Sequence, residues 1–455
     1  MRLTDLLEPL QARLVGVDAE FDALSTDSRQ LRSGELFVAL RGDCFDGHDF
    51  ARAAVERGAC ALVVEREIDT ANAPQLIVAD STKALGLIAA LKRRQFCGHL
   101  VAVTGSSGKT SVKGLLREIF AVAGTVIATP GNFNNHIGVP ISLMRLAEQQ
   151  YAVIEIGTSH PGEIAELVNF VRPNIALVNN VSAAHIAGFG SLEAIAREKG
   201  DIYRTLSTQD TAVINLDDAF SAQFIEATKH CRQIGFSLTG TSCHFPSVHA
   251  TNITFDSTGC AAFELHYAGS FVSTQLQLPG LHNLANALAA TACALAAGVT
   301  LPSIAAGVKN FAGEKGRMQI FSGPRNCAVI DDTYNANPGS VRAAIDYLSE
   351  RAGTRILVLG DLGELGEAGP QIHRDIGRYG AQKKLSALWS HGPLSAQASA
   401  AFGTEGVNFT SKAALVEALL KRLDADSVIL VKGSRSARME EVVQRVLDAK
   451  ETSAC

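Results

Sequence analysis

The sequence predicts an α/β protein of three domains with a doubly wound parallel sheet at its centre. The chain has 455 residues, which is too long for a single hydrophobic core. Short apolar runs alternate with segments of helical spacing along most of its length, as in a parallel sheet that is buried on both faces. One such run, residues 100–103, leads into a glycine-rich loop and then into a helical pattern. Together these observations predict a central P-loop domain.

Changes in this pattern divide the chain into three predicted domains. We expect a small N-terminal α/β domain over residues 1–97, a central P-loop domain over residues 98–312 and a C-terminal Rossmann-like α/β domain over residues 313–455. Residues 237–278 show alternating stretches without helical spacing, which predicts an antiparallel appendage to the central domain. An alanine-rich helix is expected to follow it over residues 281–298.

The remaining elements are predicted from local spacing and from end signals. Predicted strands cover residues 34–40, 61–65, 75–80, 100–105, 126–129, 151–157, 174–180, 211–216, 328–331, 355–360, 387–390 and 427–431. Predicted helices cover residues 48–57, 81–95, 341–348, 371–379 and 438–447. Ser81 is the expected N-cap of the helix that closes the N-terminal domain.

Composition restricts the partners and the compartment. The formal net charge is −5 and no domain carries a basic block, which argues against nucleic acid as a partner. The nine cysteines occur singly, without a CxxC pair, as expected in a reducing cytoplasm. The most apolar long stretch, residues 284–299, is mostly alanine and falls short of the ~18 apolar residues of a membrane span. We therefore expect a cytoplasmic protein without membrane insertion, and we expect a monomer.

The glycine-rich loop has the composition of a phosphate-binding loop. Glycine lets backbone N–H groups turn toward an anion, and the positive end of the following helix points to the same place. Lys109 would reach the β- and γ-phosphates, and the hydroxyl of Thr110 or Ser111 would bind Mg²⁺. Val103 stands where the usual motif has its first glycine, so an ordinary glycine turn remains the alternative for this loop considered alone. The residues predicted to bind ATP here are Gly105, Ser106, Ser107, Gly108, Lys109, Thr110 and Ser111.

Two further candidates follow other strands of the same predicted sheet. Glu155 lies between isoleucines at the carboxyl end of a strand, where a buried carboxylate needs an ion pair or a bound cation. A Mg²⁺ at Thr110 or Ser111 would supply that cation, and a salt-bridged core glutamate is the alternative. His185 follows the next strand, so it is either a structural histidine or part of the same site.

The other candidates lie farther along the chain. Lys199 occurs on a predicted helix beside acidic neighbours, and spacing alone predicts a solvated lysine there. Asn283 and Asn286 share a helix face and suit a purine edge, although Asn283 could instead cap the helix. Arg317 and Asp332 begin the C-terminal domain, and a guanidinium and a carboxylate suit the phosphate and the ribose of a nucleotide. Together they predict an active site in an interdomain cleft, with the C-terminal domain as a lid.

Taken in order, these motifs resemble one family. The strings TGSSGKTS, EIG, NNVSAAH, REKG, LHNLANALAA, GR and DDTYNANP are similar to those of the ATP-dependent Mur ligases of peptidoglycan synthesis, and the resemblance covers all three domains. DDTYNANPGS and VKGSRSARME most resemble the branch that joins D-alanyl-D-alanine to UDP-N-acetylmuramoyl-tripeptide. The branch that adds the third residue usually carries DNPR, which is absent from the sequence. That branch and the folylpolyglutamate synthetases, which share the phosphate loop, remain the alternatives.

The resemblance also implies a metal centre. It implies that Glu155 and the hydroxyl of Thr110 or Ser111 hold one Mg²⁺. It further implies that Lys199 is carbamylated by CO₂ and holds a second Mg²⁺ beside His185, which reverses the prediction of a solvated lysine. Four of the candidates are expected to act in catalysis: Lys109, His185, Lys199 and Arg317.

The same resemblance assigns the remaining side chains to the substrates. Asn283 and Asn286 would contact the adenine. Arg317 would contact the γ-phosphate and Asp332 the ribose. The residues expected to bind the UDP-linked tripeptide and the dipeptide are Ser28, Arg29, His48, Asn335, Asn337 and Lys432.

Overall fold

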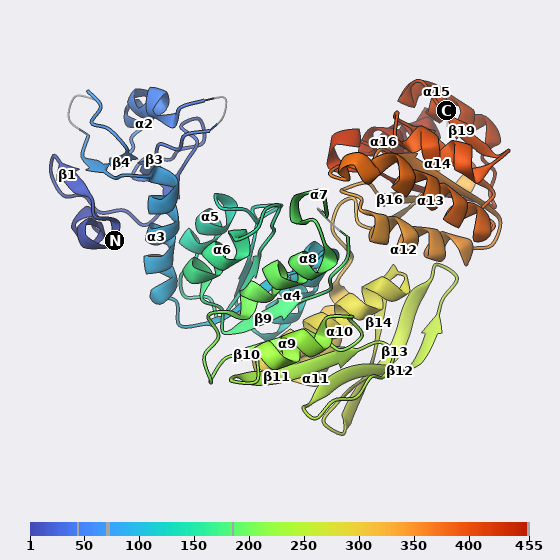
Figure 1. Cartoon of the computed structure of the whole chain (residues 1–455), viewed down its shortest axis with the longest axis horizontal. Helices are drawn as coiled ribbons and strands as arrows, with labels where there is room; N and C mark the ends of the chain where they lie inside the picture. Colours follow the sequence, from blue (N-terminus) through green and yellow to red (C-terminus); the bar gives the residue numbers. More distant parts are fainter. Residues whose placement is uncertain (43–44, 70–72, 184–185, 453–455) are drawn as a thin grey trace.

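The structure is a computed structural model that describes residues 1–42, 45–69, 73–183 and 186–452. Three sheets follow one another along the chain, and helices pack against each of them (Figure 1). The predicted three-domain α/β class is confirmed. The exact boundaries at residues 97 and 312 remain our proposal for dividing the chain.

The N-terminal sheet has five short strands in the order β1-β5-β4-β3-β2, of which only β1 runs antiparallel to its neighbour. The strands β1 and β2, of three and two residues, were not predicted because such short strands leave no alternating pattern. The elements are η1 (Leu3–Leu6), α1 (Leu7–Leu10), β1 (Arg13–Val15), β2 (Leu24–Ser25), β3 (Leu36–Val38), η2 (Gly47–Phe50), α2 (Ala51–Glu56), β4 (Ala61–Val64), β5 (Gln75–Ile77) and α3 (Ser81–Arg94).

The helix α3 joins this domain to the next. Its N-cap is Asp80, whose side chain accepts a hydrogen bond from the Lys83 N–H at 2.9 Å, so the predicted cap at Ser81 is wrong by one residue. The apolar side chains of α3 belong to the same core as those of α5 and α6 of the central domain. At its C-terminal end the buried Arg93 donates to the carbonyls of Val171 at 2.9 Å and Arg172 at 2.9 Å. A side chain of the N-terminal domain is thus tied to the backbone of the central domain.

The central sheet has nine strands in the order β14-β13-β12-β11-β10-β9-β6-β8-β7. The predicted antiparallel segment is present as β12, β13 and β14, but it continues the parallel sheet through β11 and is not a separate appendage. The strand β11 was not predicted, because arginine, glutamine and glycine interrupt its apolar run. The strands are β6 (His99–Thr104), β7 (Val126–Ala128), β8 (Tyr151–Glu155), β9 (Ile175–Val178), β10 (Thr211–Asn215), β11 (Arg232–Ser237), β12 (Ser247–Phe255), β13 (Cys260–Tyr267) and β14 (Ser270–Pro279).

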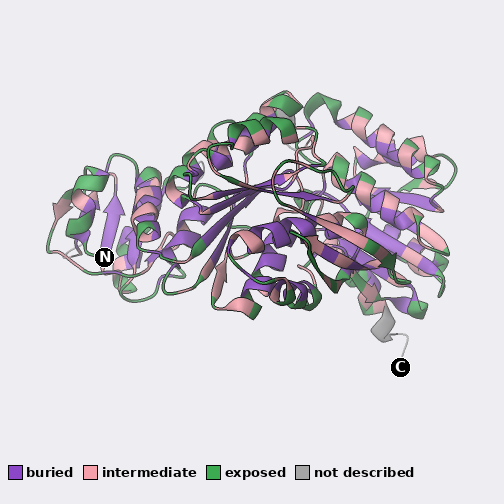
Figure 2. Cartoon of the chain, turned by 90° about the horizontal axis from the view of Figure 1, so that it is seen from below, coloured by how far each residue is buried: buried purple, intermediate pink, exposed green. Residues whose placement is uncertain are grey.

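Helices cover both faces of this sheet, as predicted. Along β6, Leu100 and Ala102 belong to one apolar core, while Val101 and Val103 belong to another on the opposite face. Figure 2 shows the resulting burial of the central strands. The helices are α4 (Lys109–Ala123), α10 (Leu281–Ala296) and α11 (Leu301–Asn310) on one face, α5 (Gly138–Met144), α6 (Glu163–Val171), α8 (Leu192–Gly200), η3 (Asp201–Tyr203) and α9 (Ser221–Ala227) on the other, and the short α7 (Ile186–Phe189).

The C-terminal sheet has six strands in the order β15-β16-β20-β17-β18-β19, and all but the edge strand β15 are parallel. Its helices again lie on two faces, with α12, α13 and α14 on one and α15 and α16 on the other. The elements are β15 (Gln319–Ser322), η4 (Pro324–Asn326), β16 (Ala328–Asp332), α12 (Pro338–Ser349), β17 (Thr354–Gly360), η5 (Gly366–Ala368), α13 (Gly369–Gln382), β18 (Ala387–His391), α14 (Ser395–Phe402), β19 (Gly406–Asn408), α15 (Lys412–Arg422), β20 (Ser427–Lys432), η6 (Arg435–Ala437) and α16 (Glu440–Thr452).

The strand order decides where a ligand can bind. Along the sheet, β8 and β7 lie on one side of β6, and β9, β10 and β11 lie on the other. The sheet order therefore reverses direction at β6, and the crevice beyond the carboxyl end of β6 is the expected ligand site. Across the described ranges, no helix is long and apolar enough to cross a membrane.

The contacts of Arg93 predict its effect on stability. Replacing Arg93 with Ala removes four hydrogen bonds and leaves buried carbonyls unpaired, so the free energy of unfolding should fall by about 2–4 kcal/mol. The neighbouring Arg94 is exposed, and Arg94→Ala should change the free energy of unfolding by less than ~0.5 kcal/mol. Urea denaturation of both variants measures the difference. Equal stabilities would contradict the proposed junction.

Candidate active site

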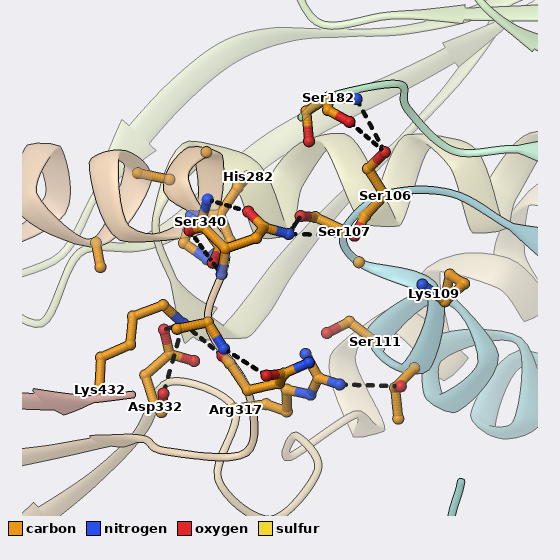
Figure 3. A pocket seen from close by; sticks show the side chains of 18 of the residues that line it. Ser106, Ser107, Lys109, Ser111, Ser182, His282, Arg317, Asp332, Ser340 and Lys432 are labelled. Atoms are coloured by element: carbon orange, nitrogen blue, oxygen red, sulfur yellow. Dashed lines mark hydrogen bonds and ion pairs between the residues drawn. The ribbon is translucent and has the colours of Figure 1, made fainter. Parts of the chain in front are cut away.

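A cavity of about 1080 Å³ lies between the central and the C-terminal domains. The loop after β6 and the start of α10 form its central-domain wall, and the loops after β16, β17 and β20 form the opposite wall (Figure 3). Among the described residues that line it, none precedes Ser106. The cavity therefore lies at the crevice expected from the strand order.

The P-loop is fixed by the segment that follows β9. The Ser106 N–H donates to the Asn180 carbonyl at 2.9 Å, and the Ser107 N–H donates to Asn180 Oδ1 at 2.9 Å. Ser106 Oγ donates to the Ser182 carbonyl at 3.0 Å and accepts from the Ser182 N–H at 2.9 Å. These bonds tie the P-loop to the segment that follows β9.

Gly108 turns the chain from the loop into α4 at a position that requires glycine. Its φ is 80°, in the left-handed region. A Cβ there would lie 2.4 Å from Asn286 Oδ1 and 2.5 Å from Asn179 Nδ2, two atoms that share a hydrogen bond of 2.9 Å. The predicted P-loop is thus supported by a steric requirement as well as by its spacing.

Lys109 begins α4 and lines the cavity. Its Nζ donates to the Gly105 carbonyl at 2.7 Å, so the ammonium lies over the mouth of the loop. Burial lowers the pKa of Lys109; the charge of Glu155 raises it and that of Arg317 lowers it. The amine thus lies where it could contact a bound phosphate.

Glu155 ends β8 and is 2% exposed. Its Oε1 accepts from Asn134 Nδ2 at 2.8 Å and from Thr110 Oγ1 at 3.3 Å. Its Oε2 has no hydrogen-bond donor within the described residues and lies 3.5 Å from Lys113 Nζ. The side chain of Lys113 is also buried, and its Nζ donates to the Gly131 carbonyl at 2.8 Å.

The sequence interpretation missed Lys113. It gave two alternatives for Glu155, a bound cation or a salt bridge in the core, and named no partner for the salt bridge. Spacing could have indicated Lys113, because a residue four positions after Lys109 lies on the same face of the helix. That face of α4 packs against β8.

The oxygen atoms near Glu155 fit a magnesium ion. Thr110 and the buried Ser111 supply hydroxyls at the cavity, and Glu155 supplies a carboxylate oxygen without a donor. In the described part of the chain, no group of three or more His, Cys, Asp or Glu side chains is placed so that it could hold a metal ion. Magnesium is typically held by one or two carboxylates and by substrate phosphates, so this sparse donor set suits it.

Lys199 lies on α8 and is 2% exposed, which contradicts the prediction of a solvated lysine drawn from spacing alone. Burial holds its pKa well below the usual value, and the nearby charge of Lys109 lowers it further. The adjacent Glu198 fixes α8, because its carboxylate accepts hydrogen bonds from the N–H groups of Gly162 at 2.6 Å and Ile164 at 2.8 Å. His185 lies outside the described residues.

Arg317 reaches the cavity from the chain segment that precedes β15. One Nη of Arg317, which is labelled in Figure 3, donates to Thr110 Oγ1 at 3.2 Å. The guanidinium stacks on the Tyr334 ring at 4.2 Å. Its Nε is buried and has no hydrogen-bond partner among the residues that the structure describes. A guanidinium held by stacking and with an unused donor is suited to a phosphate oxygen.

The two asparagines of α10 line the cavity, and their side chains contact neighbouring groups of the protein. Asn283 Nδ2 donates to the Pro279 carbonyl at 2.8 Å. Asn286 links this helix to the P-loop through Asn179, which also donates to the Ser107 carbonyl at 3.0 Å. Asn179 and Asn180 were not among the predicted site residues. They begin the NNVSAAH motif after β9, which was the available signal, but their hydrogen bonds run between distant segments, so spacing does not show their partners.

The predicted residues of the C-terminal domain also come together. Asp332 Oδ2 lies 2.5 Å from Lys432 Nζ, which donates to the Asn335 carbonyl at 3.1 Å (Figure 3). Asn337 caps α12 and donates from Nδ2 to Ser107 Oγ at 3.0 Å. The last contact crosses from one domain to the other, so this residue joins the two walls of the cavity.

The three predicted residues of the N-terminal domain are not part of the cavity. Their domain lies at the opposite end of the molecule from the C-terminal domain (Figure 1). Ser28 is buried and Arg29 is exposed. His48 is buried, with Nδ1 2.5 Å from Asp46 Oδ1 and Nε2 accepting the Glu65 N–H at 2.8 Å. In this arrangement His48 shapes its loop, and its contact with a substrate stays a prediction.

Fold and cavity together define a P-loop protein of three domains with an interdomain cavity, and comparison with known proteins identifies its family. Family models described as "Mur ligase family, catalytic domain", "Mur ligase middle domain" and "Mur ligase, glutamate ligase domain" match residues 20–102, 103–294 and 316–435. The chain belongs to the Mur ligase family, whose members are ATP-dependent ligases.

The chain is also similar to individual members of this family over nearly its full length. The chain is 43% identical over 445 residues to the UDP-N-acetylmuramoyl-tripeptide–D-alanyl-D-alanine ligase of Escherichia coli K12, with 97% of each chain covered. It superposes on the crystal structure of MurF from Acinetobacter baumannii with a TM-score of 0.90 at 35% identity, covering 98% of each chain. It also superposes on MurF from Thermotoga maritima in complex with ADP, with a TM-score of 0.84, 26% identity and coverage of 95% and 98%.

The pairing of Lys113 with Glu155 predicts a non-additive effect on stability. Lys113→Met and Glu155→Gln should each lower the free energy of unfolding by about 3–5 kcal/mol, because each leaves a buried charge without its partner. The double variant should lose less than the sum by at least about 1 kcal/mol. Denaturant unfolding of the four proteins measures this coupling, with Lys83→Met as an exposed-lysine control. Additive losses would mean that the two side chains do not act as a pair.

Proposed function

We propose that this chain joins D-alanyl-D-alanine to UDP-N-acetylmuramoyl-tripeptide, with cleavage of ATP to ADP and phosphate, in the synthesis of peptidoglycan precursors. The observation that carries the proposal is the cavity, in which the P-loop of the central domain faces Arg317 and the loops of the C-terminal domain. Full-length relatives from Escherichia coli and Haemophilus influenzae that bear this activity in their names, at 43% and 39% identity, support the choice of substrates. They favour it over addition of the third residue and over folylpolyglutamate synthesis.

The first step forms an acyl phosphate. A carboxylate oxygen of the tripeptide attacks the γ-phosphorus of ATP, the bond to the β-phosphate oxygen breaks, and ADP leaves. Lys109 and Arg317 bring two cationic side chains to the place where negative charge spreads over the transferred group. Magnesium bound by Glu155 and the hydroxyl of Thr110 or Ser111 would neutralise further phosphate charge.

The second step forms the amide bond. The amine of the dipeptide, after losing its proton, attacks the carbonyl carbon of the acyl phosphate. The tetrahedral intermediate then collapses, the C–O bond to phosphate breaks, and inorganic phosphate leaves. No protein nucleophile is required, so positioning and electrostatic stabilisation account for the catalysis.

Lys199 is proposed to act as a carbamate. Its amine adds to CO₂ to give N-carboxylysine and one released proton, a reaction that requires the unprotonated amine. Burial and the neighbouring Lys109 favour that neutral form. The product is a carboxylate-like group, which would suit a second magnesium ion together with His185.

The remaining placements follow from the same reaction. We assign the UDP-sugar to the N-terminal domain with Ser28, Arg29 and His48, and the peptide ends to the side of the cavity formed by Asn335, Asn337 and Lys432. We also place the reaction in the cytoplasm and expect a monomer. Cys60, Cys97, Cys231, Cys243, Cys260 and Cys293 are free thiols, in keeping with a reducing compartment.

Phosphate release with each substrate omitted in turn tests the reaction. Release should require ATP, UDP-N-acetylmuramoyl-tripeptide and D-alanyl-D-alanine together, and the ligated pentapeptide product should appear in equal amount. Lys109→Ala should lower kcat by at least about 100-fold, because a charge that stabilises the transition state is lost. Phosphate release that ignores the dipeptide would reject the ligase and favour a simple ATPase.

The carbamate is tested separately at Lys199. Lys199→Ala should abolish ligation, and added bicarbonate or a short carboxylate should restore part of it by replacing the missing anion. With ¹³C-labelled bicarbonate, the wild type should show a carbamate carbonyl resonance that is absent from the variant. Near-normal turnover of Lys199→Ala without any additive would rule out this role.

A further inference from the structure

The helix α12 contacts the central domain at both of its ends. At the N-terminal end, its cap Asn337 donates to Ser107 Oγ and to the Ser106 carbonyl, at 3.0 and 3.3 Å. At the other end, the Tyr347 hydroxyl donates to the Thr258 carbonyl at 2.8 Å. The helix has 12 residues, so the two contacts are separated by most of a length of about 18 Å.

The second contact is made with the turn between β12 and β13, residues 256–259. Besides the Tyr347 bond, Arg351 Nη1 donates to the Ser257 carbonyl at 3.1 Å, and its guanidinium stacks on the Tyr347 ring at 4.8 Å. Tyr347 is 4% exposed. Figure 1 shows the tip of the three-stranded extension directly below α12.

The turn is held by hydrogen bonds of its own. Asp256 Oδ1 accepts hydrogen bonds from the N–H groups of Thr258 at 2.8 Å and Cys260 at 3.0 Å, and the Asp256 carbonyl accepts from the Gly259 N–H at 2.9 Å. Gly259 has a φ of 82°, and a Cβ there would lie 2.9 Å from atoms of both Tyr347 and Arg351. The carbonyls of Ser257 and Thr258 are therefore presented to Arg351 and Tyr347 by a hydrogen-bonded turn.

The turn is also bonded to the start of α10. The Gly259 carbonyl accepts the N–H of Gly280, the N-cap of that helix, at 3.0 Å. Asn286 of α10 is connected through Asn179 to the P-loop, and the P-loop is connected to Asn337 at the start of α12. Turn, α10, P-loop and α12 thus form a closed circuit of contacts around one side of the cavity.

The two helices of this circuit face each other across the cavity. Residues 282, 283, 285 and 286 of α10 line one side, and residues 339, 340, 343 and 344 of α12 line the other. We propose that Tyr347 and Arg351 are positioning residues, which clamp α12 to the turn and thereby set the width of the nucleotide slot between α12 and α10. This role rests on the proposed placement of the nucleotide at Asn283 and Asn286.

Both side chains keep their hydrogen-bond donors over the working range of pH. Burial raises the pKa of Tyr347 to about 12, so its hydroxyl remains a donor over the working range of pH. Arginine keeps its charge under the same conditions. Neither side chain lines the cavity, so their removal alters no direct contact with a ligand.

The chain provides a matched control for these substitutions. Arg342 lies on α12, as Tyr347 does, whereas Arg351 follows the end of that helix. The Arg342 guanidinium stacks on the Tyr379 ring at 4.9 Å, but Tyr379 belongs to α13 of the C-terminal domain. Arg342→Gln therefore removes an arginine–tyrosine stack from α12 and leaves the contact with the turn intact. Any effect specific to the clamp should be absent from this variant.

Binding of ADP with Mg²⁺, measured by calorimetry, tests the proposal. Arg351→Gln and Tyr347→Phe should each raise the Kd for ADP and the KM for ATP about fivefold, since each removes a hydrogen bond between the domains. The kcat at saturating ATP should change less than about twofold, and Arg351→Lys should recover part of the affinity. Arg342→Gln should bind ADP as the wild type does.

Hydrogen exchange of the ligand-free protein gives a second readout. The clamp variants should exchange faster at residues 256–259, at the first turn of α10 and at residues 105–108, whereas the control should not. Unchanged ADP affinity, or faster exchange confined to residues 256–259, would overturn the proposal. Because ADP binding and exchange need no acceptor, a failure of the ligation assay alone would reject the proposed reaction and not the clamp.

Discussion

The site depends on an imbalance of charge around one buried carboxylate. Glu155 lies at the end of β8, and Lys113 and Lys109 of the P-loop helix are its cationic neighbours. Burial lowers the pKa of Lys109, and the charge of Arg317 lowers it further, so these two cations repel each other. A bound polyphosphate would relieve this repulsion. The arrangement therefore favours binding of an anion.

The second constraint is the relative position of the domains. The P-loop, the asparagines of α10 and Arg317 meet in one cavity only because the C-terminal domain packs beside the carboxyl end of β6. The contacts of Asn337 with the P-loop and of Tyr347 with the β12–β13 turn fix that position. The antiparallel extension of the central sheet is therefore more than an edge, because it gives the C-terminal domain a second point of contact away from the cavity.

Much of the fold could be predicted because its strands are buried on both faces and leave continuous apolar runs. This held for β6, β8 and β9, where the predicted and observed strands overlap. The same pattern did not predict β11, whose apolar run is interrupted by Gly235, or β19, which has only three residues. In both cases the pairing with neighbouring strands determines the strand. The cap of α3 was misplaced because Asp80 and Ser81 are both good capping residues, and only the side-chain contact distinguishes them.

Among the site residues, the sequence by itself determined those whose chemistry is local. The glycine loop, Lys109 and its hydroxyl neighbours are adjacent in the chain, so their spacing was sufficient to predict a phosphate site. The burial of Lys199, the partnership of Lys113 with Glu155 and the hydrogen bonds of Asn179 and Asn180 were decided by the tertiary structure alone. These features depend on segments that are separated by tens of residues in the chain. Only sheet order and helix packing bring such segments close enough for burial, a hydrogen bond or an ion pair.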